Sequence, residues 1–258
     1  MEILKFNING LAAAFKKPYT NKGVELSYSH IHKIALLGIL GGIIGIDKTS
    51  NKFNFYEQLK DLKVSIVPKE EVFSTQNEPF TETVGFSNRE NGKVGSNYLS
   101  KYEILINPSW DIYIMDSNNK NYKKIKDFIL NNRAYFIPYL GKNHFFANIE
   151  NMEVLEGEET KEYSNIDSLF LPFGNILEDD FGNEKELIEI DNELENPLLF
   201  SEEDNNIIFK QCLQIGFDNN LMGEGQNQYI ETKFIFTNKT VRGEKTLIKC
   251  ENKILYFF

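Results

Sequence analysis

The segment from Ile34 to Ile46 constrains this chain most, because about 13 almost uninterrupted apolar residues must be buried. It is too short to cross a membrane, which takes about 20 residues of helix. Apolar side chains at 34, 36, 37, 40 and 43 predict a helix that begins near Ser29, a residue type favoured at the N-cap. Glycines at 38, 41, 42 and 45 each cost a helix about 1 kcal/mol relative to alanine. We therefore expect the helix to pack closely on a sheet, which would compensate for them.

The patterns on either side of this helix predict an α+β fold. Apolar runs predict strands, an amphipathic stretch predicts a second helix, and Asn91-Gly92 predicts a hairpin turn within a polar segment. In chain order we expect a strand at 3–8, the apolar helix, a strand at 63–67, a hairpin over 71–100, strands at 103–107 and 111–115, a helix at 122–131, and a strand at 145–154. That order is typical of the split βαβ, ferredoxin-like layout of many RNA-recognition modules.

Four more strands are expected near the C-terminus, at 207–215, 229–236, 246–249 and 254–258. We therefore divide the chain into a ferredoxin-like domain at 1–154, an acidic insert at 155–206 and a strand-rich C-terminal part at 207–258.

Charge is distributed very unevenly along the chain. The net charge is −10, yet residues 150–206 hold 19 Asp and Glu against only Lys161 and Lys185, which leaves +7 for the rest. A basic body is compatible with nucleic acid, whereas the overall charge alone would argue against it. The acidic block is either a solvated face or an electrostatic guard that confines RNA to one surface.

A turn-rich loop after the first strand, residues 15–21, combines Lys16, Lys17, Tyr19 and Asn21. Two cations, an aromatic ring and an amide are the groups that pair phosphates, stack a base and contact a base edge. The alternative is an ordinary exposed turn.

A second segment, residues 139–147, brings Tyr139, Lys142, Asn143 and His144 together just before a strand. One hypothesis is that it binds phosphate. The other is metal-independent RNA cleavage, with His144 as general base and Lys142 or Tyr139 assisting.

Other chemistries find little support in the sequence. His30 and His32 are two residues apart, which does not place them on one helix face, and Cys212 and Cys250 are distant from each other, so no metal site is expected. No phosphate loop or dinucleotide fingerprint is present, and we expect no cofactor. Two cysteines and an N-terminus without a secretory signal favour a reducing, cytoplasmic setting.

The two loops also carry a family resemblance. The run from Phe15 to Asn21, followed by His32 to Gly45, resembles the N-terminal signature of the CRISPR-associated Cas five (Cas5) family. The run from Pro138 to Asn148 resembles the second motif of that family in its type I-B-like branch. The resemblance covers roughly residues 3–46 and 98–154, and it is stronger to the non-cutting branch than to the type I-C branch, which processes precursor guide RNA.

This resemblance implies a fold, a function and partners. The fold would be a RAMP domain related to RNA-recognition motifs, with a thumb-like hairpin at about 70–101. The function would be to hold the 5′ repeat-derived handle of the guide RNA (crRNA) in a type I Cascade complex without catalysis. Its partners would be the backbone and large subunits, with target DNA near the PAM as a further contact.

Within that reading, ten residues would contact RNA. Phosphate contacts are expected from Lys16, Lys17, Lys33, Arg89, Lys93 and Lys142, and base or sugar contacts from Tyr19, Asn21, Asn143 and His144. Two alternatives remain open: a metal-independent endoribonuclease that uses His144, Lys142 and Tyr139, and a structural protein whose basic loops bind an acidic partner.

Overall fold

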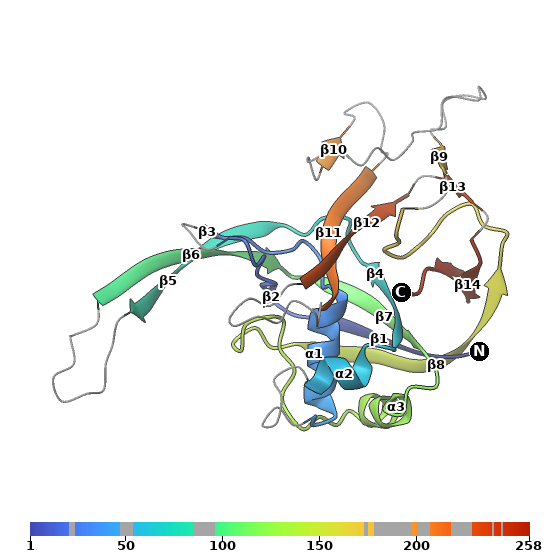
Figure 1. Ribbon diagram of the computed structural model, residues 1–258, viewed down its shortest axis with the longest axis horizontal. Helices are drawn as coiled ribbons and strands as arrows, with labels where there is room; N and C mark the ends of the chain where they lie inside the picture. The colour runs from blue at the N-terminus through green and yellow to red at the C-terminus, as the bar shows by residue number, and fades with distance from the viewer. Residues whose placement is uncertain are drawn as a thin grey trace.

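A computed structural model describes residues 1–20, 24–46, 54–84, 96–172, 175–177, 198–200, 207–217, 229–238, 240–243 and 245–258. The fold is mixed α/β, rich in strands and poor in helices (Figure 1). Its elements up to residue 160 are β1 (Glu2–Asn9), β2 (Ala12–Ala13), β3 (Val24–Glu25), α1 (Lys33–Ile43), α2 (Asn54–Leu59), β4 (Lys63–Pro68), β5 (Thr75–Val84), β6 (Ser96–Ile106), β7 (Ser109–Met115), α3 (Tyr122–Leu130) and β8 (Asn148–Thr160). The remaining strands are β9 (Asn175–Leu177), β10 (Leu198–Phe200), β11 (Ile207–Phe217), β12 (Tyr229–Thr237), β13 (Thr240–Arg242), β14 (Leu247–Cys250) and β15 (Lys253–Leu255).

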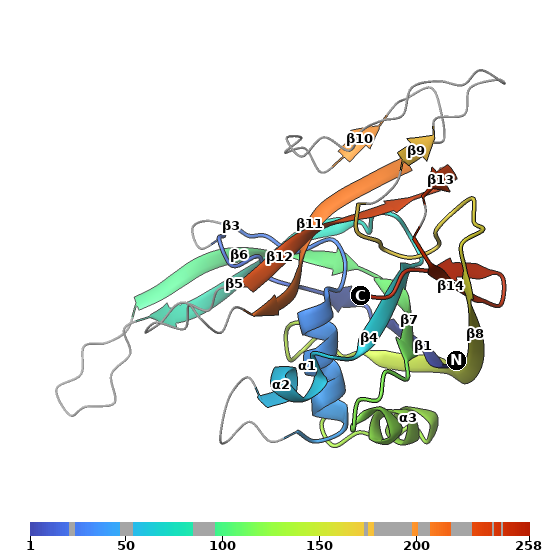
Figure 2. The same ribbon diagram turned by 45° about the vertical axis from the view of Figure 1, so that its right-hand side comes forward.

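The main sheet has six strands in the order β15-β14-β8-β1-β7-β4. Its four strands β8, β1, β7 and β4 pair antiparallel throughout. In the chain, α1 and α2 lie between β1 and β4, and α3 lies between β7 and β8. Figure 2 shows the three helices gathered on one side of the molecule, with β11 and β12 above them.

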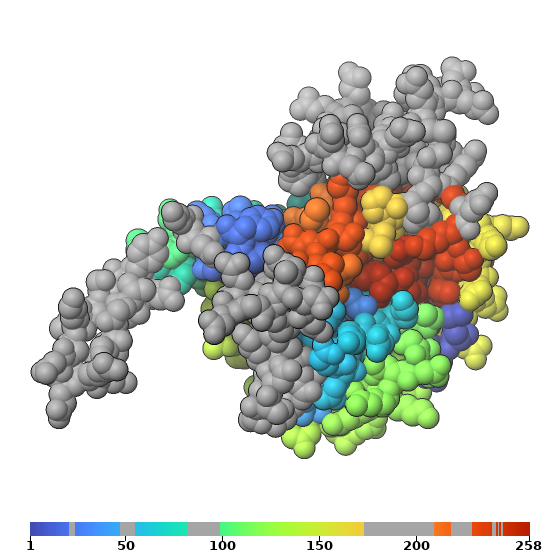
Figure 3. Space-filling view, in the orientation of Figure 1, coloured from blue at the N-terminus to red at the C-terminus, as the bar shows by residue number. Residues whose placement is uncertain are grey.

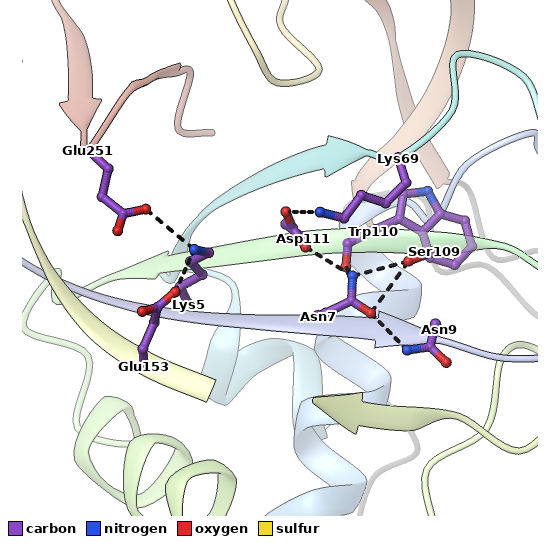
Figure 4. Close-up of polar contacts among 9 residues, drawn as sticks. All are labelled: Lys5, Asn7, Asn9, Lys69, Ser109, Trp110, Asp111, Glu153 and Glu251. Carbon is purple, nitrogen blue, oxygen red and sulfur yellow. Dashed lines mark hydrogen bonds and ion pairs between the residues drawn. The ribbon is translucent and has the colours of Figure 1, made fainter. Parts of the chain in front are cut away.

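Strand β1 shows that one face of the sheet is apolar, whereas the other combines polar contacts with a smaller buried cluster that includes Ile3 and Tyr113. Leu4, Phe6 and Ile8 are buried in the large core that they share with α1, whereas Lys5 and Asn7 lie on the opposite face because successive side chains of a strand alternate. There, Asn7 Nδ2 donates to Ser109 Oγ (3.1 Å), the Trp110 carbonyl (3.2 Å) and Asp111 Oδ1 (2.9 Å) (Figure 4). Lys5 pairs with Glu153 and Glu251, and Lys69 pairs with Asp111. These polar contacts tie β1 to its neighbours across the sheet.

The start of α1 differs from the sequence prediction. The N-cap is His32, whose Nδ1 accepts a hydrogen bond from the Ala35 N–H (3.3 Å), and Ser29 lies outside the helix. Ser29 instead donates its backbone N–H to Gln211 Oε1 (2.9 Å) on β11. The expectation of a Ser29 cap was wrong because this tertiary contact holds the Ser29 backbone outside the helix.

The glycines in and just after α1 also differ from expectation. At Gly41 a Cβ would come within 2.9 Å of Phe55 Cβ, so this glycine permits close packing of α1 on α2 rather than on a sheet. Gly45 has φ +72°, a conformation that L side chains rarely adopt. Gly38 and Gly42 are not needed in this way: a Cβ would meet only Phe55, at 3.9 Å, or nothing within 4 Å.

Strands β5 and β6 form a long antiparallel hairpin that extends away from the body (Figure 1). Their register runs from Thr75 opposite Leu105 to Val84 opposite Ser96, and Asn91-Gly92 lies outside the described residues. The strand expected at 103–107 is the end of β6, which also pairs with β2 and β3. The hairpin base is thereby joined to the loop that follows β1.

The C-terminal strands are integrated with the rest of the chain. Strand β8, expected at 145–154, begins at Asn148 and continues to Thr160, across the expected boundary at residue 154. Strand β14 pairs with it, with Leu247 opposite Thr160, and so extends the main sheet. Glu156, Glu158 and Glu159 therefore belong to a strand, whereas 12 of the 19 acidic residues of the block lie in 178–197 and 201–206, outside the described residues. Among the described helices, none is long and apolar enough to span a membrane.

Candidate functional site

The two loops singled out in the sequence lie against each other. Ala14 donates its N–H to the Leu140 carbonyl (3.1 Å), and Leu140 is fully buried. Gly141 has φ +85°, and a Cβ there would come within 1.8 Å of the Ala14 carbonyl oxygen. Only glycine permits this approach of two backbones. The contact brings residues 14–20, the first loop, beside residues 138–147, the second loop.

The second loop is braced by its own backbone. Leu140 donates to the Phe145 carbonyl (2.7 Å), Phe145 to the Lys142 carbonyl (3.0 Å) and Ala147 to the Pro138 carbonyl (3.0 Å). Lys142, Asn143 and His144 therefore form the tip of a tight turn, with Asn143 and His144 exposed. The anchors on each side of the tip, Leu140 and Phe145, are buried.

Glu25 on β3 joins the cations of the two loops. Its carboxylate lies 2.6 Å from Lys16 Nζ and 3.4 Å from Lys142 Nζ. Partial burial raises the pKa of this carboxyl group, but the hydrogen bond from Lys16 and the charge of Lys142 outweigh it and leave the pKa below its usual value. Glu25 is therefore ionised at neutral pH and sits between two lysines, where an anionic ligand would also find its partners.

The hairpin contributes the aromatic part of the site. Lys142 Nζ lies 4.9 Å from the centre of the Tyr102 ring and 5.4 Å from that of Phe80. The Tyr102 hydroxyl is 3.2 Å from His144 Nε2, and the His144 ring lies 4.2 Å from Phe145. Glu25, Phe80 and Tyr102 were absent from the sequence prediction. Only strand pairing reveals them, because each lies far along the chain from Lys142.

Two further residues of the first loop lie near Tyr28 and Glu231. Lys17 donates its N–H to the Leu26 carbonyl (2.8 Å), and its ammonium is 5.9 Å from the Tyr28 ring. Tyr19 is 67% exposed, which leaves its ring free to stack. Asn21, Arg89 and Lys93 lie outside the described residues.

Lys33 needs a correction as a candidate phosphate contact. It is buried in α1, and its Nζ donates to the backbone oxygen of Phe258 (3.1 Å). Burial lowers the pKa of its ammonium to about 8. The side chain therefore helps to hold the C-terminal segment against α1 and is engaged there rather than at Lys16 and Lys142.

The groups named for catalysis are only partly brought together. Lys142 engages Glu25 and the aromatic rings, while Tyr139 forms a backbone bridge with Phe146. Within the described part of the chain, no hydrogen bond joins either residue to His144. The same residues include no cluster of three or more His, Cys, Asp or Glu able to hold a metal ion.

His30 and His32 lie in the interior rather than in this site. Trp110 Nε1 donates to His30 Nδ1 (3.3 Å), and His30 Nε2 donates to the Glu71 carbonyl (2.9 Å). Burial lowers the pKa of His30 to about 4 and that of His32 to about 3. Tyr28 bonds to Glu231 on β12, and burial followed by this contact raises the pKa of Tyr28. In Figure 3, the N-terminal segment (blue) correspondingly borders β11 and β12 (orange).

Comparison with known proteins identifies relatives. The model of a family described as "CRISPR-associated protein (Cas_Cas5)" matches residues 3–206. No curated protein matches. Among solved structures, a chain of a "CRISPR RNA-guided surveillance complex" has a TM-score of 0.52 at 12% identity, covering 93% of this chain and 90% of that one. A CRISPR protein from Archaeoglobus fulgidus has a TM-score of 0.45 at 8% identity, covering 99% and 98%. The family match spans well over half of the sequence, and the chain therefore belongs to the CRISPR-associated Cas5 family.

Proposed function

We propose that this chain is the subunit of a type I CRISPR surveillance complex, Cascade, that holds the 5′ repeat-derived handle of the guide RNA without cutting it. Family membership supports a role in CRISPR defence. The resemblance of residues 138–148 supports the type I-B-like branch, and we place its action in the cytoplasm.

The observation that carries the proposal is the convergence of the two loops. Lys16 and Lys142 meet at Glu25, Asn143 and His144 follow Lys142 at the tip of the second loop, and Lys17 and Tyr19 follow Lys16 in the first loop. Cations that pair phosphates, next to exposed rings and amides, are the combination with which proteins bind single-stranded RNA. A protein that bound only an acidic neighbour would need the lysines but not the rings.

The strand order supports a ferredoxin-like, RAMP-type core. Numbered along the chain, β1, β4, β7 and β8 are the first to fourth strands of the core, and they lie in the order fourth, first, third, second. In this proposal the β5–β6 hairpin acts as the thumb. Because its Tyr102 and Phe80 contact Lys142, the thumb and the loops would hold RNA together.

The partners of the proposal are the crRNA handle, the backbone subunits and the large subunit, with target DNA near the PAM as a further contact. The projecting hairpin supports this assembly, since a long two-stranded ribbon buries little apolar surface alone and gains stability by packing on a neighbour. The acidic part of β8 supports a confined RNA path, because like charges repel phosphate.

We further propose that the chain is not an enzyme. A metal-independent nuclease needs a base beside the 2′-hydroxyl and a cation at the phosphate. Here Lys142 is engaged by Glu25, and His144 contacts Tyr102, so the arrangement supports binding more than cleavage.

Incubation of the purified protein with its own repeat RNA in EDTA tests the proposal. We expect retention without cleavage, and we expect Lys142→Ala to reduce the magnitude of the salt slope of binding by roughly 0.7, the value for one phosphate contact on a single strand. Lys123→Ala, which removes an exposed lysine from α3, is the matched control and should leave the slope unchanged.

Two outcomes would contradict the proposal. Cleavage that His144→Ala abolishes while binding persists would assign the nuclease function to this loop. No retention of RNA even at low salt would favour a structural interaction protein.

A further inference from the structure

A groove of about 1200 Å³ runs along α1 beside the candidate site. It is lined by the α1 residues Ala35, Gly38 and Gly42, which we call its floor, and by the segment 135–139, which we call its wall. The wall is joined to the end of α1, because Tyr135 and Phe136 donate their N–H groups to the carbonyls of Ile43 and Gly42. The volume exceeds the range of about 300–1,000 Å³ usual for small-molecule pockets, which favours an extended ligand. Lys16 and Lys142 line the same groove, so the groove and the lysine pair form one continuous surface.

The wall of the groove presents aromatic rings to solvent. Tyr135 is 69% exposed, Phe136 is 62% exposed and Tyr139 is 40% exposed. Large apolar side chains gathered at such exposure mark a binding surface, because isolated ones are common but clusters are not. Three rings within five residues, facing a cavity, offer flat surfaces on which another ring can stack.

Two positions on the floor of the groove have no side chain. Gly41 and Gly45 are required by packing or by backbone conformation, as described above, but Gly38 and Gly42 are not. Both weaken the helix, and a Cβ at Gly42 would enter open space. Their effect is that no side chain projects from α1 at these two positions, although the Gly42 carbonyl accepts a hydrogen bond from the Phe136 N–H (3.3 Å).

His32 adds a hydrogen-bond donor to this apolar surface. It lines the groove, is more than nine-tenths buried, and uses Nδ1 to accept the Ala35 N–H. The neutral ring must then carry its proton on Nε2, for which no hydrogen-bond partner exists among the described residues. Burial keeps the pKa of His32 near 3, so the ring stays neutral at physiological pH. His32 keeps 7% of its surface exposed and lines the groove, so water or a ligand atom can accept this hydrogen bond.

We propose that this groove receives the bases of a single-stranded RNA whose phosphates are held at Lys16 and Lys142. This inference rests on the proposed function and adds where the bases lie. Charge complementarity at the mouth selects a polyanion, the rings and the bare helix face stack bases of any sequence, and His32 donates to a base oxygen or ring nitrogen. An apolar helix from a protein partner would fit the wall but would leave the two lysines without a role.

Filling the groove tests the proposal, with Gly42→Leu as the main variant and Gly42→Ala as its small counterpart. The probes are a labelled single-stranded RNA of about eight nucleotides and an abasic oligonucleotide of the same length and charge. We expect wild type to bind the RNA at least about tenfold more tightly than the abasic probe. Gly42→Leu should remove most of that difference, and Gly42→Ala should remove a smaller part, while neither variant lowers the melting temperature.

The phosphate and base contributions separate in the same titrations. Lys142→Ala should weaken both probes by the same factor, because both carry phosphates. If wild type binds the two probes equally and Lys142→Ala weakens both, the proposed function stands and the base groove is wrong. If neither probe binds, the proposed function itself fails. If Gly42→Leu blocks assembly with partner proteins but leaves both RNA affinities unchanged, the groove belongs to a protein partner and the proposal is overturned.

Discussion

Two regions of this protein place histidine among aromatic rings, and they are built in opposite ways. In the interior block, defined by Tyr28, His30, His32 and Trp110, every side chain is buried, and both nitrogens of His30 are hydrogen-bonded. In the loop tip, defined by Lys142, Asn143 and His144, the histidine and asparagine are exposed. Residue type alone therefore does not mark a site. The same imidazole closes a core in one place and faces solvent in the other.

The surroundings explain this difference. The interior block lies where the N-terminal segment meets β11 and β12, with the His30 ring 4.6 Å from Phe209. The polar ring of His30 is tolerated there because each of its nitrogens has a partner. The loop tip is anchored by the buried Leu140 and by Gly141, which packs against the Ala14 backbone. Asn143 and His144 are therefore held in place while they remain exposed.

The largest expected difference between the two regions is in the free energy of unfolding of the variants His30→Ala and His144→Ala. His30→Ala leaves a cavity and strips the buried Trp110 Nε1–H of its acceptor, so we expect a loss of about 3 kcal/mol in the free energy of unfolding. His144→Ala should change it by less than about 0.5 kcal/mol, since the side chain is exposed. Chemical denaturation measures both. Equal losses would mean that the two regions are not distinct.

Acid should act on the interior block through protonation. The pKa values of His30 and His32 in the folded protein, about 4 and about 3, lie below the value of about 6.5 in the unfolded chain. The unfolded state therefore takes up protons first, and stability should fall as the pH drops below about 6.5 towards 4. We expect a loss of roughly 2–3 kcal/mol between pH 6.5 and pH 5.

Denaturation at several pH values checks this expectation. His144→Ala should keep the wild-type pH dependence, whereas a conservative His32→Asn change should reduce the slope. If the free energy of unfolding does not change between pH 6.5 and pH 5, burial does not disfavour the charged forms of His30 and His32, and the expectation is wrong.

For RNA binding we expect the opposite order, with a larger effect from the loop tip than from the interior block. His144→Ala should cost roughly 1–3 kcal/mol of handle binding if the ring stacks on a base or bonds to it. We expect no matching loss in a variant of the interior block that remains folded, such as His30→Asn, because His30 is buried with Trp110 and Glu71 as its partners. Fluorescence anisotropy with repeat-derived RNA measures both affinities.

The smallest expected effect concerns Glu25. Its carboxylate competes with phosphate for Lys16 and Lys142, so Glu25→Gln should tighten RNA binding by about 0.5–1 kcal/mol. Glu153→Gln, which breaks a comparable pair with Lys5 on the other face of the sheet, is the control and should not change RNA affinity. Weaker binding by Glu25→Gln would show instead that Glu25 orients the lysines.

Much of the local structure follows from sequence periodicity. The alternation from Ile3 to Ile8 and the runs at 63–67 and 111–115 correspond to β1, β4 and β7, and the amphipathic stretch at 122–131 corresponds to α3. The start of α1 and the length of β8 were not predictable, because Gln211 and β14 decide them from far along the chain. Periodicity records which face of an element is buried, but it does not record which distant element buries it.

The candidate site divides in the same manner. The sequence by itself identified both loops, because Lys, Tyr, Asn, Gly and His in turn-forming segments are local features. Only the tertiary structure brought Gly141 against Ala14, placed Glu25 between two lysines and turned Lys33 into the interior. The physical reason is that charge, stacking and backbone conformation belong to single residues, whereas burial and pairing depend on the residues that the fold places opposite them.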